Sequence, residues 1–345
     1  MTASRMPHGR PGEATPTETT AAYIMAPGPP EDIRIGRLPL PALGPTEVLV
    51  RTTAMAVNHV DTFVRSGSYR TPLPVPFVIG RDLVGVVAAA GDLSSFRVGE
   101  EVWCNSLGHG GRQGSFAEYA AVPAERLYRL PTGVDAELAV SLAHPAATAY
   151  LALFRHGGLR VGQTVFVGGG GGGVGSAAVQ LANVAGARVI TTAATRDADW
   201  CRACGADVVI DYHDERATEL VRDAAPEGID VHVDTSGRHD FESSVPLLAR
   251  GGRLIVLAAL KARPVLPVGA LYTNDASVRG FIISNASVAD LATTAAAVNQ
   301  LLAAGRLRSR ISVRLQLQDA VRAHQLMERP DPSVGPGRIV VHPGA

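Results

Sequence analysis

A run of six consecutive glycines, Gly168–Gly173, constrains the fold of this chain more than any other sequence feature. It follows the apolar segment Thr164–Val167, precedes a segment with the pattern of a helix, and begins the spacing G-x-G-x-x-G. Small residues at this spacing allow a tight strand-to-helix turn, a close approach of the backbone to a pyrophosphate, and close packing of the helix on the strand. Unpaired N–H groups at the helix N-terminus then favour the anion. A flexible glycine linker is the alternative, but the flanking strand and helix favour a dinucleotide site with expected contacts at Gly170, Gly172, Gly173, Val174 and Gly175.

The end of the second predicted strand bears on which dinucleotide binds. A site for NAD usually places Asp or Glu there, where the carboxylate accepts a hydrogen bond from the ribose 2′-OH. The strand Arg188–Thr192 has no acid at its tip, and Asp197 comes only later. Thr192 and Thr195 can donate hydrogen bonds, and Arg196 can pair with a 2′-phosphate. We therefore expect NADPH as the cofactor; an exposed loop cation is the alternative explanation of Arg196.

Strands and helices alternate regularly in the second half of the chain. Such alternation is typical of right-handed βαβ units, so we expect an α/β domain with a parallel sheet covered on both faces. The expected strands are 164–167, 188–192, 208–212, 231–235, 253–258 and 278–283, and the expected helices are 145–154, 175–185, 199–204, 217–225 and 241–248. A helix over 288–304, a strand over 310–315, a helix over 318–327 and a strand over 337–342 are expected to follow.

The pattern is different between residues 22 and 129. Short apolar runs such as Glu47–Arg51, Leu83–Ala88 and Glu101–Trp103 are separated by glycines and prolines. Short strands at this spacing, with turn signals between them, predict an all-β barrel or sandwich. Residues 1–20 are rich in Pro, Thr and Gly and contain no apolar run, so we expect a flexible tail and no secretory signal.

Charge and composition argue against several classes of partner. The 32 Lys and Arg residues balance 32 Asp and Glu residues, which argues against a nucleic-acid-binding protein and against attraction to anionic membranes. No apolar run reaches the roughly 18 residues that a membrane span needs. Three cysteines are too few for a disulfide framework, so we expect a reducing compartment and a cytoplasmic protein. Cys201 and Cys204 have CxxC spacing, but without a second pair they are expected to have no metal or redox role.

Several motifs outside the glycine run resemble one enzyme family. They are Ala56–Asp61 (AVNHVD), Gly80–Val87 (GRDLVGVV), Gly114–Tyr119 (GSFAEY), Ala147–Tyr150 (ATAY) and Ala203–Asp207 (ACGAD). Together with the glycine run they resemble the medium-chain dehydrogenase/reductase superfamily, and within it the zinc-independent quinone oxidoreductase branch. The resemblance covers nearly all of the chain after the tail, and its motifs are not specific for a substrate.

The resemblance implies a Rossmann domain with a doubly wound parallel sheet, inserted into a mostly-β, GroES-like barrel domain built from both ends of the chain. The expected boundaries are 1–20 for the tail, 21–144 for the first part of the catalytic barrel domain, 145–285 for the nucleotide-binding domain and 286–345 for the rest of the catalytic domain. The nicotinamide is expected in the cleft between the two domains. Nucleotide-binding domains of this family usually pair edge to edge, so we expect a homodimer through the Rossmann edge strand.

The residues that match the zinc-binding positions of the superfamily test the branch. They are Asn58, Arg81 with Asp82, and His144. A catalytic zinc needs three N, S or O ligands besides water, and an amide, a guanidinium and one imidazole do not provide them. The four-cysteine structural lobe is also absent, since Cys104 stands alone in that region. We therefore expect no metal.

Without a metal, the reaction must be one that hydride transfer can nearly accomplish alone, such as reduction of a quinone or of an activated alkene. Such a site needs positioning, a donor for the oxygen that gains charge, and a proton source. Asn58 is the candidate donor, and Tyr69 resembles the tyrosine that lines the family's substrate pocket and can give a proton. His59 and His144 are further candidates for proton transfer, although each of these four also has a plain structural explanation. Phe63 stands where many quinone reductases have a second tyrosine, which argues against a quinone.

Further cofactor contacts are expected at the carboxyl ends of strands, where open α/β sheets bind ligands. Ser236, Leu257 and Ala258 hold such positions. By resemblance, Thr148 lies near the nicotinamide, and the stretch that contains Phe281 and Ile283 meets its carboxamide.

Three functions fit these residues. The first is NADPH-dependent reduction of a quinone or an α,β-unsaturated carbonyl. The second is a dedicated pathway reductase of an enoyl thioester, an imine or another activated double bond, which Phe63, His59 and His144 favour. The third is a non-catalytic NADPH-binding protein similar to the lens crystallins that resemble this branch. In each case the expected partner is a small molecule, not a nucleic acid or a membrane.

Overall fold

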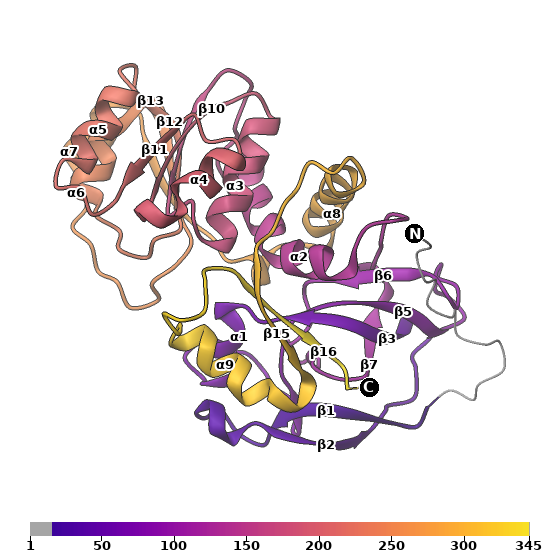
Figure 1. Cartoon of the computed structure of the whole chain (residues 1–345). Helices are drawn as coiled ribbons and strands as arrows, with labels where there is room; N and C mark the ends of the chain where they lie inside the picture. Colours follow the sequence, from indigo (N-terminus) through magenta and orange to yellow (C-terminus); the bar gives the residue numbers. More distant parts are fainter. Residues whose placement is uncertain (1–15, 345) are drawn as a thin grey trace, which may run out of the picture. The chain divides into compact units, whose positions relative to one another are not determined.

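The computed structural model describes residues 16–344, which separate into two compact units. Unit 1 consists of the residues up to Ala143 and from Ile311 onward, and unit 2 consists of His144–Arg310. A Rossmann domain is therefore inserted into a mostly-β domain made from both ends of the chain (Figure 1). The second boundary differs from the expected one at residue 285, because helix α8 (Val288–Ala303) groups with unit 2.

Unit 2 is built on a six-stranded parallel sheet in the order β11-β10-β9-β12-β13-β14. The first three strands in the sequence follow one another from the centre to one edge of the sheet, and the last three follow one another from the centre to the other edge. This is the order of a doubly wound dinucleotide-binding sheet. The strands are β9 (Thr164–Gly168), β10 (Arg188–Ala193), β11 (Val208–Asp211), β12 (Ile229–Asp234), β13 (Leu248–Val256) and β14 (Ser277–Gly280).

Helices cover both faces of this sheet, with α3 and α4 on one face and α5, α6 and α7 on the other (Figure 1). Their bounds are α3 (Gly173–Val184), α4 (Ala198–Ala203), α5 (Ala217–Ala224), α6 (Phe241–Ser244) and α7 (Val268–Thr273). Burial on both faces explains the nearly continuous apolar strands of the sequence. On the second face, Ile190, Ile210 and Leu254 of the sheet pack in one core with Val221 of α5 and Val245 beyond α6.

Unit 1 consists mainly of two sheets. In the larger one β15-β16-β3-β5-β6-β8 are neighbours and β7 also pairs with β3, and the smaller one has the order β2-β1-β4. The strands are β1 (Glu18–Ile24), β2 (Arg34–Pro39), β3 (Glu47–Ala56), β4 (Phe77–Val78), β5 (Asp82–Ala90), β6 (Glu101–Cys104), β7 (Tyr119–Pro123), β8 (Tyr128–Arg129), β15 (Ile311–Gln316) and β16 (Arg338–His342). Helices α1 (His59–Arg65) and α9 (Ala320–Glu328) contact each other, and Met55, Leu83 and Phe116 are fully buried in the core.

Several expected elements have different bounds in the structure; for example, the strand expected over 253–258 begins at Leu248 and ends at Val256, as β13. Strand β1 begins at Glu18, inside the expected tail, while residues 1–15 lie outside the described residues. The helix expected over 241–248 ends at Ser244 and continues as a 3-10 turn, because Pro246 in that turn has no N–H to donate. The strand expected over 278–283 ends at Gly280.

One helical stretch, from Ala136 to His156, is long and apolar enough to cross a bilayer by length and composition. It comprises α2 (Ala136–Tyr150) and a π-helical turn, Leu151–His156. In its most apolar window 78% is buried inside the structure. Such burial is typical of a core helix, and it accounts for the apolar character of the segment without a membrane.

Candidate active site

The glycine run forms the turn between β9 and α3. A Cβ on Gly170 would lie 2.2 Å from the hydroxyl oxygen of Thr191, and a Cβ on Gly175 would lie 2.1 Å from the carbonyl oxygen of Gly169. The packing of the turn itself therefore requires glycine at these two positions. A Cβ on Gly172 would have only an ordinary contact of 3.5 Å, so the absence of a side chain there leaves space beside the backbone for a ligand.

The start of α3 offers unpaired N–H groups at this turn. Gly172 is the N-cap residue with an extended backbone, and no side chain caps the helix. The N–H groups of the first helical turn have no carbonyl partner within the helix. These groups and the positive end of the helix dipole suit an anion such as a pyrophosphate. The residues present therefore fit a dinucleotide, with the N–H groups of Gly173 and Val174 available to hold it.

The three residues expected near the adenosine ribose have different surroundings. The Thr192 hydroxyl accepts a hydrogen bond from the Gly169 N–H at 3.3 Å, so it supports the glycine turn. The Thr195 hydroxyl donates to the Asp211 carboxylate. The side chain of Arg196 is 74% exposed. Of the three, Arg196 is therefore the one that offers its charge to a ligand.

Arg310, to which no motif points, holds the outer part of the glycine turn. Its guanidinium donates to the carbonyl oxygen of Gly171 at 2.9 Å and to Oδ1 of Asp197 at 2.7 Å. It also lies over the ring of Trp200, 4.8 Å from the ring centroid. A Cβ on Gly171 would lie 2.9 Å from the Asp197 carboxylate, so that carboxylate packs directly against the turn. Arg310 therefore neutralises a negative charge beside the expected phosphate site.

The loops after β12 and β13, on the other side of β9 in the sheet, are linked by hydrogen bonds. The hydroxyl and the N–H of Ser236 both donate to Oδ1 of Asp234, at 2.6 and 2.9 Å. The other carboxylate oxygen of Asp234 lies 2.6 Å from Nδ1 of His239, and the Nε2 of that ring lies 2.9 Å from the carbonyl oxygen of Ala258. Ser236 and Ala258 thus lie at the carboxyl ends of β12 and β13 as expected, with Leu257 directly after β13.

The other expected residues of unit 2 lie on α2 and after β14. Thr148 is one helical turn beyond His144, and its buried hydroxyl has no hydrogen-bond partner within the described residues. An orphaned hydroxyl of this kind needs a partner, which a bound ligand can supply. Phe281 stacks on His156 with the ring centroids 4.3 Å apart, and Ile283 is buried in a 3-10 turn.

In unit 1, Asn58 is held on three sides by buried charged groups. As the residue before α1 it donates its backbone N–H to Asp61 at 2.8 Å. Its side-chain Nδ2 donates to Oδ2 of Asp82 at 2.8 Å, and its Oδ1 accepts from the guanidinium of Arg338 at 2.6 Å. The amide is only 3% exposed, and these bonds fix which end is oxygen and which is nitrogen. The Asn58 side chain also forms a hydrogen bond with Asp61, which favours the charged form of that carboxyl.

The charges around Asn58 do not form a zinc site. Arg81 lies 3.7 Å from Asp61, so two guanidinium groups, those of Arg81 and Arg338, belong to this cluster. Burial raises the pKa of Asp82 to about 8, with the charge of Asp61 adding to the effect, and burial raises the pKa of Asp61 to about 6 against the attraction of Arg81. The Asn58 oxygen is already bonded to a cation, so this donor set does not fit a metal ion. Within residues 16–344, no three His, Cys, Asp or Glu side chains are grouped to hold one.

Tyr69 has a partner that the sequence did not point to. Its hydroxyl lies 3.3 Å from Nε2 of His109, and the two rings are stacked with centroids 5.8 Å apart. Partial burial, together with the positive charges of Arg81 and Arg112, lowers the pKa of His109, so the ring is neutral at neutral pH. His59 is exposed at the start of α1 and makes no side-chain hydrogen bond among the described residues.

The CxxC cysteines are thiols in the interior of unit 2. Burial raises the pKa of Cys201 to about 11 and that of Cys204 to about 12. A thiolate is the reactive and metal-binding form of cysteine, and it is disfavoured at both positions. These values agree with the expectation that the pair is structural.

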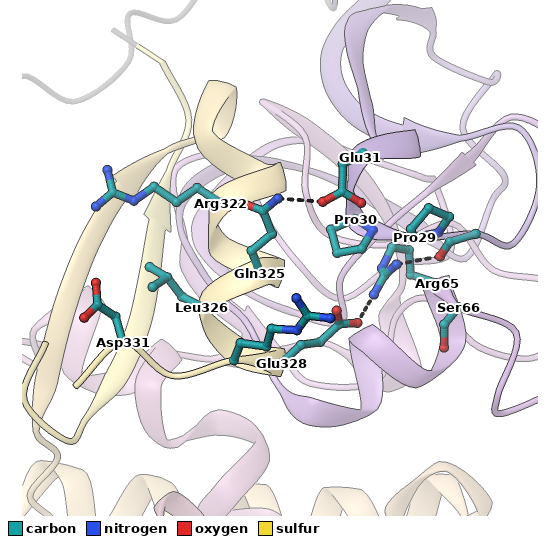
Figure 2. A pocket seen from close by; sticks show the side chains of 12 residues that line it. Pro29, Pro30, Glu31, Arg65, Ser66, Arg322, Gln325, Leu326, Glu328 and Asp331 are labelled. Carbon is teal, nitrogen blue, oxygen red and sulfur yellow. Dashed lines mark hydrogen bonds and ion pairs between the residues drawn. The ribbon is translucent and has the colours of Figure 1, made fainter. Parts of the chain in front are cut away.

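A cavity of about 860 Å³ opens on unit 1 between α1, α9 and the segment before β2 (Figure 2). Its carboxylates are already engaged: Arg65 donates to Glu328, and Gln325 donates to Glu31. Figure 2 shows that Arg322 points away from Arg65, so the cations do not converge on one point. No predicted site residue lines this cavity, and its charged groups join structural elements to one another.

Comparison with known proteins identifies both units. Residues 44–132 match the family model of the alcohol dehydrogenase GroES-like domain, and residues 173–300 match that of the zinc-binding dehydrogenases. A quinone oxidoreductase from Sus scrofa is 30% identical over 302 residues, which are 86% of this chain and 90% of that protein. The chain belongs to the quinone oxidoreductase branch of the medium-chain dehydrogenase/reductase superfamily. It is therefore an oxidoreductase of an NAD(P)-dependent family.

Other relatives span a range of substrates and cofactors. Prostaglandin reductase-3 from Bos taurus is 32% identical over 290 residues, which are 79% of this chain and 75% of that protein. A solved NAD-dependent alcohol dehydrogenase has a TM-score of 0.83 at 31% identity, and a mycobacterial protein solved in complex with NADPH has a TM-score of 0.81 at 29% identity. Each covers 94% of this chain and 100% of its own. These matches support the Rossmann and GroES-like architecture, and they include both forms of the cofactor.

Replacing Asp82 by Asn is expected to change how stability depends on pH. The pKa of Asp82 in the folded chain, about 8, lies above the ordinary value of 3.8, so the folded state holds a proton that the unfolded state has lost. The stabilising effect of that proton disappears as pH rises through about 8. The melting temperature of the wild type should therefore fall relative to Asp82→Asn as pH rises from about 4 to about 8, and the difference should stay constant above that. The exposed Asp92→Asn is the control, and parallel curves for the wild type and Asp82→Asn would contradict this assignment.

Removing the charge of Arg310 is expected to weaken dinucleotide binding. In Arg310→Met the Asp197 carboxylate beside the glycine turn loses the closer of its two cations, so affinity for the dinucleotide should fall about tenfold. The double variant Arg310→Met with Asp197→Asn should recover most of this loss, because the uncompensated charge is gone. Arg308→Met, on an exposed neighbour, is the matched control. Equal affinities of Arg310→Met and the wild type in a fluorescence titration would refute this role.

Proposed function

We propose that this chain is a zinc-independent, NADPH-dependent oxidoreductase that reduces a quinone or an α,β-unsaturated carbonyl. When bound, NADPH supplies a hydride. The observation that carries the proposal is the state of Asn58, whose amide is fixed in one orientation by Asp82 and Arg338. A neutral N–H donor, fixed in direction, replaces the metal ion in polarising a carbonyl oxygen.

Asn58 stabilises the oxygen that gains negative charge when a conjugated acceptor is reduced. A fixed hydrogen-bond donor does this without reorganising at the moment of reaction. Arg338 acts through Asn58, since its guanidinium holds the amide oxygen and so fixes the orientation of the amide. Quinones and enones suit such a site, because their conjugation already spreads the developing charge over a carbonyl oxygen.

Tyr69 supplies the proton that an enolate needs. With Nε2 protonated, the neutral ring of His109 donates to the phenol oxygen and leaves the Tyr69 hydrogen free to move to the product. A quinone gains a far more stable, aromatic product and depends less on this proton. His59 and His144 remain candidates for proton transfer.

The preference for NADPH rests on the residues after β10. Thr195 is bonded to Asp211, and the exposed guanidinium of Arg196, whose Nε lies 4.0 Å from the Asp197 carboxylate, can also pair with a 2′-phosphate. A carboxylate that would accept from a ribose 2′-OH is missing from the tip of that strand in the sequence. Asp197 is the nearest acid in the sequence, and Arg310 already neutralises it.

A dedicated reductase of an enoyl thioester, an imine or another activated double bond is the second candidate. Phe63 favours it, because this side chain on α1 is 38% exposed and presents an apolar ring where many quinone reductases have a tyrosine. The similarity to a prostaglandin reductase is compatible with such a substrate. The third candidate, a non-catalytic NADPH-binding protein, has no specific observation in its favour.

We also infer that two copies pair through the edge strand β14 and that the protein is cytoplasmic. β14 is the last strand of the six-stranded sheet, so its outer edge has no partner strand among the residues that the structure describes. Near it in the sequence, Val265, Val268 and Tyr272 are 65%, 58% and 71% exposed. An exposed edge beside apolar side chains suits an interface with another copy.

The cofactor preference is tested by the oxidation of NADPH and of NADH with benzoquinone, phenanthrenequinone, an enone and a crotonyl thioester. We expect turnover with NADPH, and we expect Arg196→Ala to raise the KM for NADPH about tenfold while leaving NADH unaffected. Arg202→Ala, another exposed arginine nearby, is the control. An equal rise in KM for both cofactors would contradict a role of Arg196 in recognising the 2′-phosphate. Tight NADPH binding without turnover of any acceptor would favour the non-catalytic function.

The proton donor is tested by Tyr69→Phe. Reduction of an enone should fall by about two orders of magnitude, the usual contribution of a positioned proton donor, while reduction of benzoquinone should change little. Tyr272→Phe is the control, since that tyrosine is largely exposed. If Tyr69→Phe reduces both substrates as fast as the wild type, the tyrosine only lines the pocket. An equal loss of rate with the enone and with benzoquinone would instead indicate that Tyr69 contributes to substrate binding.

A further inference from the structure

A second cavity, of about 320 Å³, lies in unit 2 beside the amino end of β9. Its walls include Gln163, the residue directly before β9, and residues 156–158, at the end of the π-helical turn that follows α2. The glycine turn lies at the opposite, carboxyl end of β9. Doubly wound sheets bind dinucleotides at that carboxyl end, so this cavity is separate from the expected cofactor site.

The cavity is lined by arginines from four different segments of unit 2. These segments are the π-helical turn, the loop before β9, β13 and β14, and the residues are Arg155, Arg160, Arg253 and Arg279. Two carboxylates balance part of this charge, because Asp290 pairs with Arg155 at 3.2 Å and Asp230 attracts Arg253. Four guanidinium groups against two carboxylates leave two positive charges at the cavity.

Arg253 builds the wall of the cavity. Its guanidinium donates to the carbonyl oxygens of Gly157 at 2.7 Å and Gly158 at 3.3 Å, and to Oε1 of Gln163 at 3.3 Å. The same Gln163 oxygen accepts from the backbone N–H of Arg160 at 2.9 Å. These bonds join the end of the π-helical turn to the loop before β9 and to β13. The cavity is therefore formed before any ligand enters it.

Arg160 and Arg279 are the cations that remain available to a ligand. Both side chains are exposed, and neither forms an ion pair with a carboxylate within residues 16–344. Arg279 donates one N–H to the carbonyl oxygen of His156 at 3.1 Å, which leaves its other N–H groups for a further acceptor. The two positive charges that the carboxylates do not balance are thus carried by side chains that can turn toward the cavity.

The positive charges are close enough to act on one another. Burial lowers the pKa of Arg253, and the charges of Arg160 and Arg279 lower it further, against the attraction of Asp230. Burial also lowers the pKa of His156, and the neighbouring arginines add to that effect, so the imidazole brings no further charge at neutral pH. Like charges held together repel, and an anion bound between them removes that repulsion.

We infer that this cavity is a binding site for a small phosphate compound, held by Arg160 and Arg279 against the wall that Arg253 builds. Guanidinium groups match the geometry of phosphate oxygens and donate to them in pairs. The volume of the cavity is near the lower end of the range for small-molecule sites, which suits a compact anion. The proposed reduction does not use this cavity, so the inference goes beyond the proposed function.

Pairing of two copies through β14 is compatible with this site. Strands pair through backbone groups in the plane of the sheet, while side chains project from its two faces. The Arg279 side chain reaches the His156 carbonyl, so it lies on the face where the π-helical turn ends. Arg279 can therefore serve the cavity while the backbone of β14 pairs with a second copy.

The test is a calorimetric titration of the full chain with sodium pyrophosphate, at about 150 mM NaCl to screen weak surface attraction. NADPH is present in excess, so that the glycine turn is occupied. We expect one saturable binding event with a Kd below about 1 mM. Arg160→Gln combined with Arg279→Gln should weaken it at least about tenfold. Arg160→Gln alone is a second variant should the pair not fold, since its side chain makes no hydrogen bond among the described residues.

A control with the same change of net charge is available in unit 2. Arg202 and Arg216 are exposed and pair with Asp199 and Glu219 on α4 and α5, outside the cavity. Arg202→Gln combined with Arg216→Gln should bind pyrophosphate as tightly as the wild type. Equal weakening in both double variants would show that only net charge matters, and would overturn the inference.

Two further measurements identify the ligand class. Saturating pyrophosphate should raise the melting temperature of the wild type by a few degrees and leave that of the Arg160 and Arg279 double variant unchanged. Inorganic phosphate should bind at the same site more weakly, because it carries less charge. Citrate binding as tightly as pyrophosphate would overturn the assignment to phosphate.

The outcomes separate this inference from the proposed function. Absence of saturable pyrophosphate binding by the wild type, or equal binding by the Arg160 and Arg279 double variant, overturns the inference and leaves the reductase proposal intact. A chain that binds pyrophosphate through these two arginines but binds no NADPH supports the inference and overturns the proposed function.

Discussion

Unit 2 depends on the close packing of helix α3 on strand β9, in which glycines let the two backbones meet without side chains between them. Gly175 lies so close to the Gly169 carbonyl, and Gly170 so close to Thr191, that any side chain at either glycine would force the turn open. This close approach directs the first N–H groups of α3 past the end of the sheet, at the point where the strand order reverses. The same steric demand that fixes the turn therefore creates the anion site.

In unit 1, the corresponding constraint is the set of contacts that hold a neutral amide in one orientation. Asn58 is bonded to a buried carboxylate at one end and to a buried guanidinium at the other. Removing such charges from water costs energy, and a cluster of two acids and two arginines recovers it only when the geometry is good. The raised pKa of Asp82 is the sign of that cost. The cluster fixes the orientation of the Asn58 amide, because an amide between a fixed donor and a fixed acceptor cannot flip.

Local patterns predicted the elements well and the long-range contacts poorly. The glycine turn and the six strands of unit 2 follow from spacing and apolar runs within about a dozen residues, and their order follows from the handedness of βαβ units. Arg338 is 280 positions from Asn58, and Arg310 is 139 positions from Gly171, so no local pattern could join them. Other differences had a visible signal: Pro246 lies inside the segment expected as one helix.

These long-range contacts share one physical arrangement. Arg338 and Arg310 each place a buried or half-buried cation between acceptors, and each thereby orders a polar segment that is expected to face a ligand. Because arginine keeps its charge at every pH at which the protein is folded, the supports at Asn58 and at the glycine turn do not depend on pH.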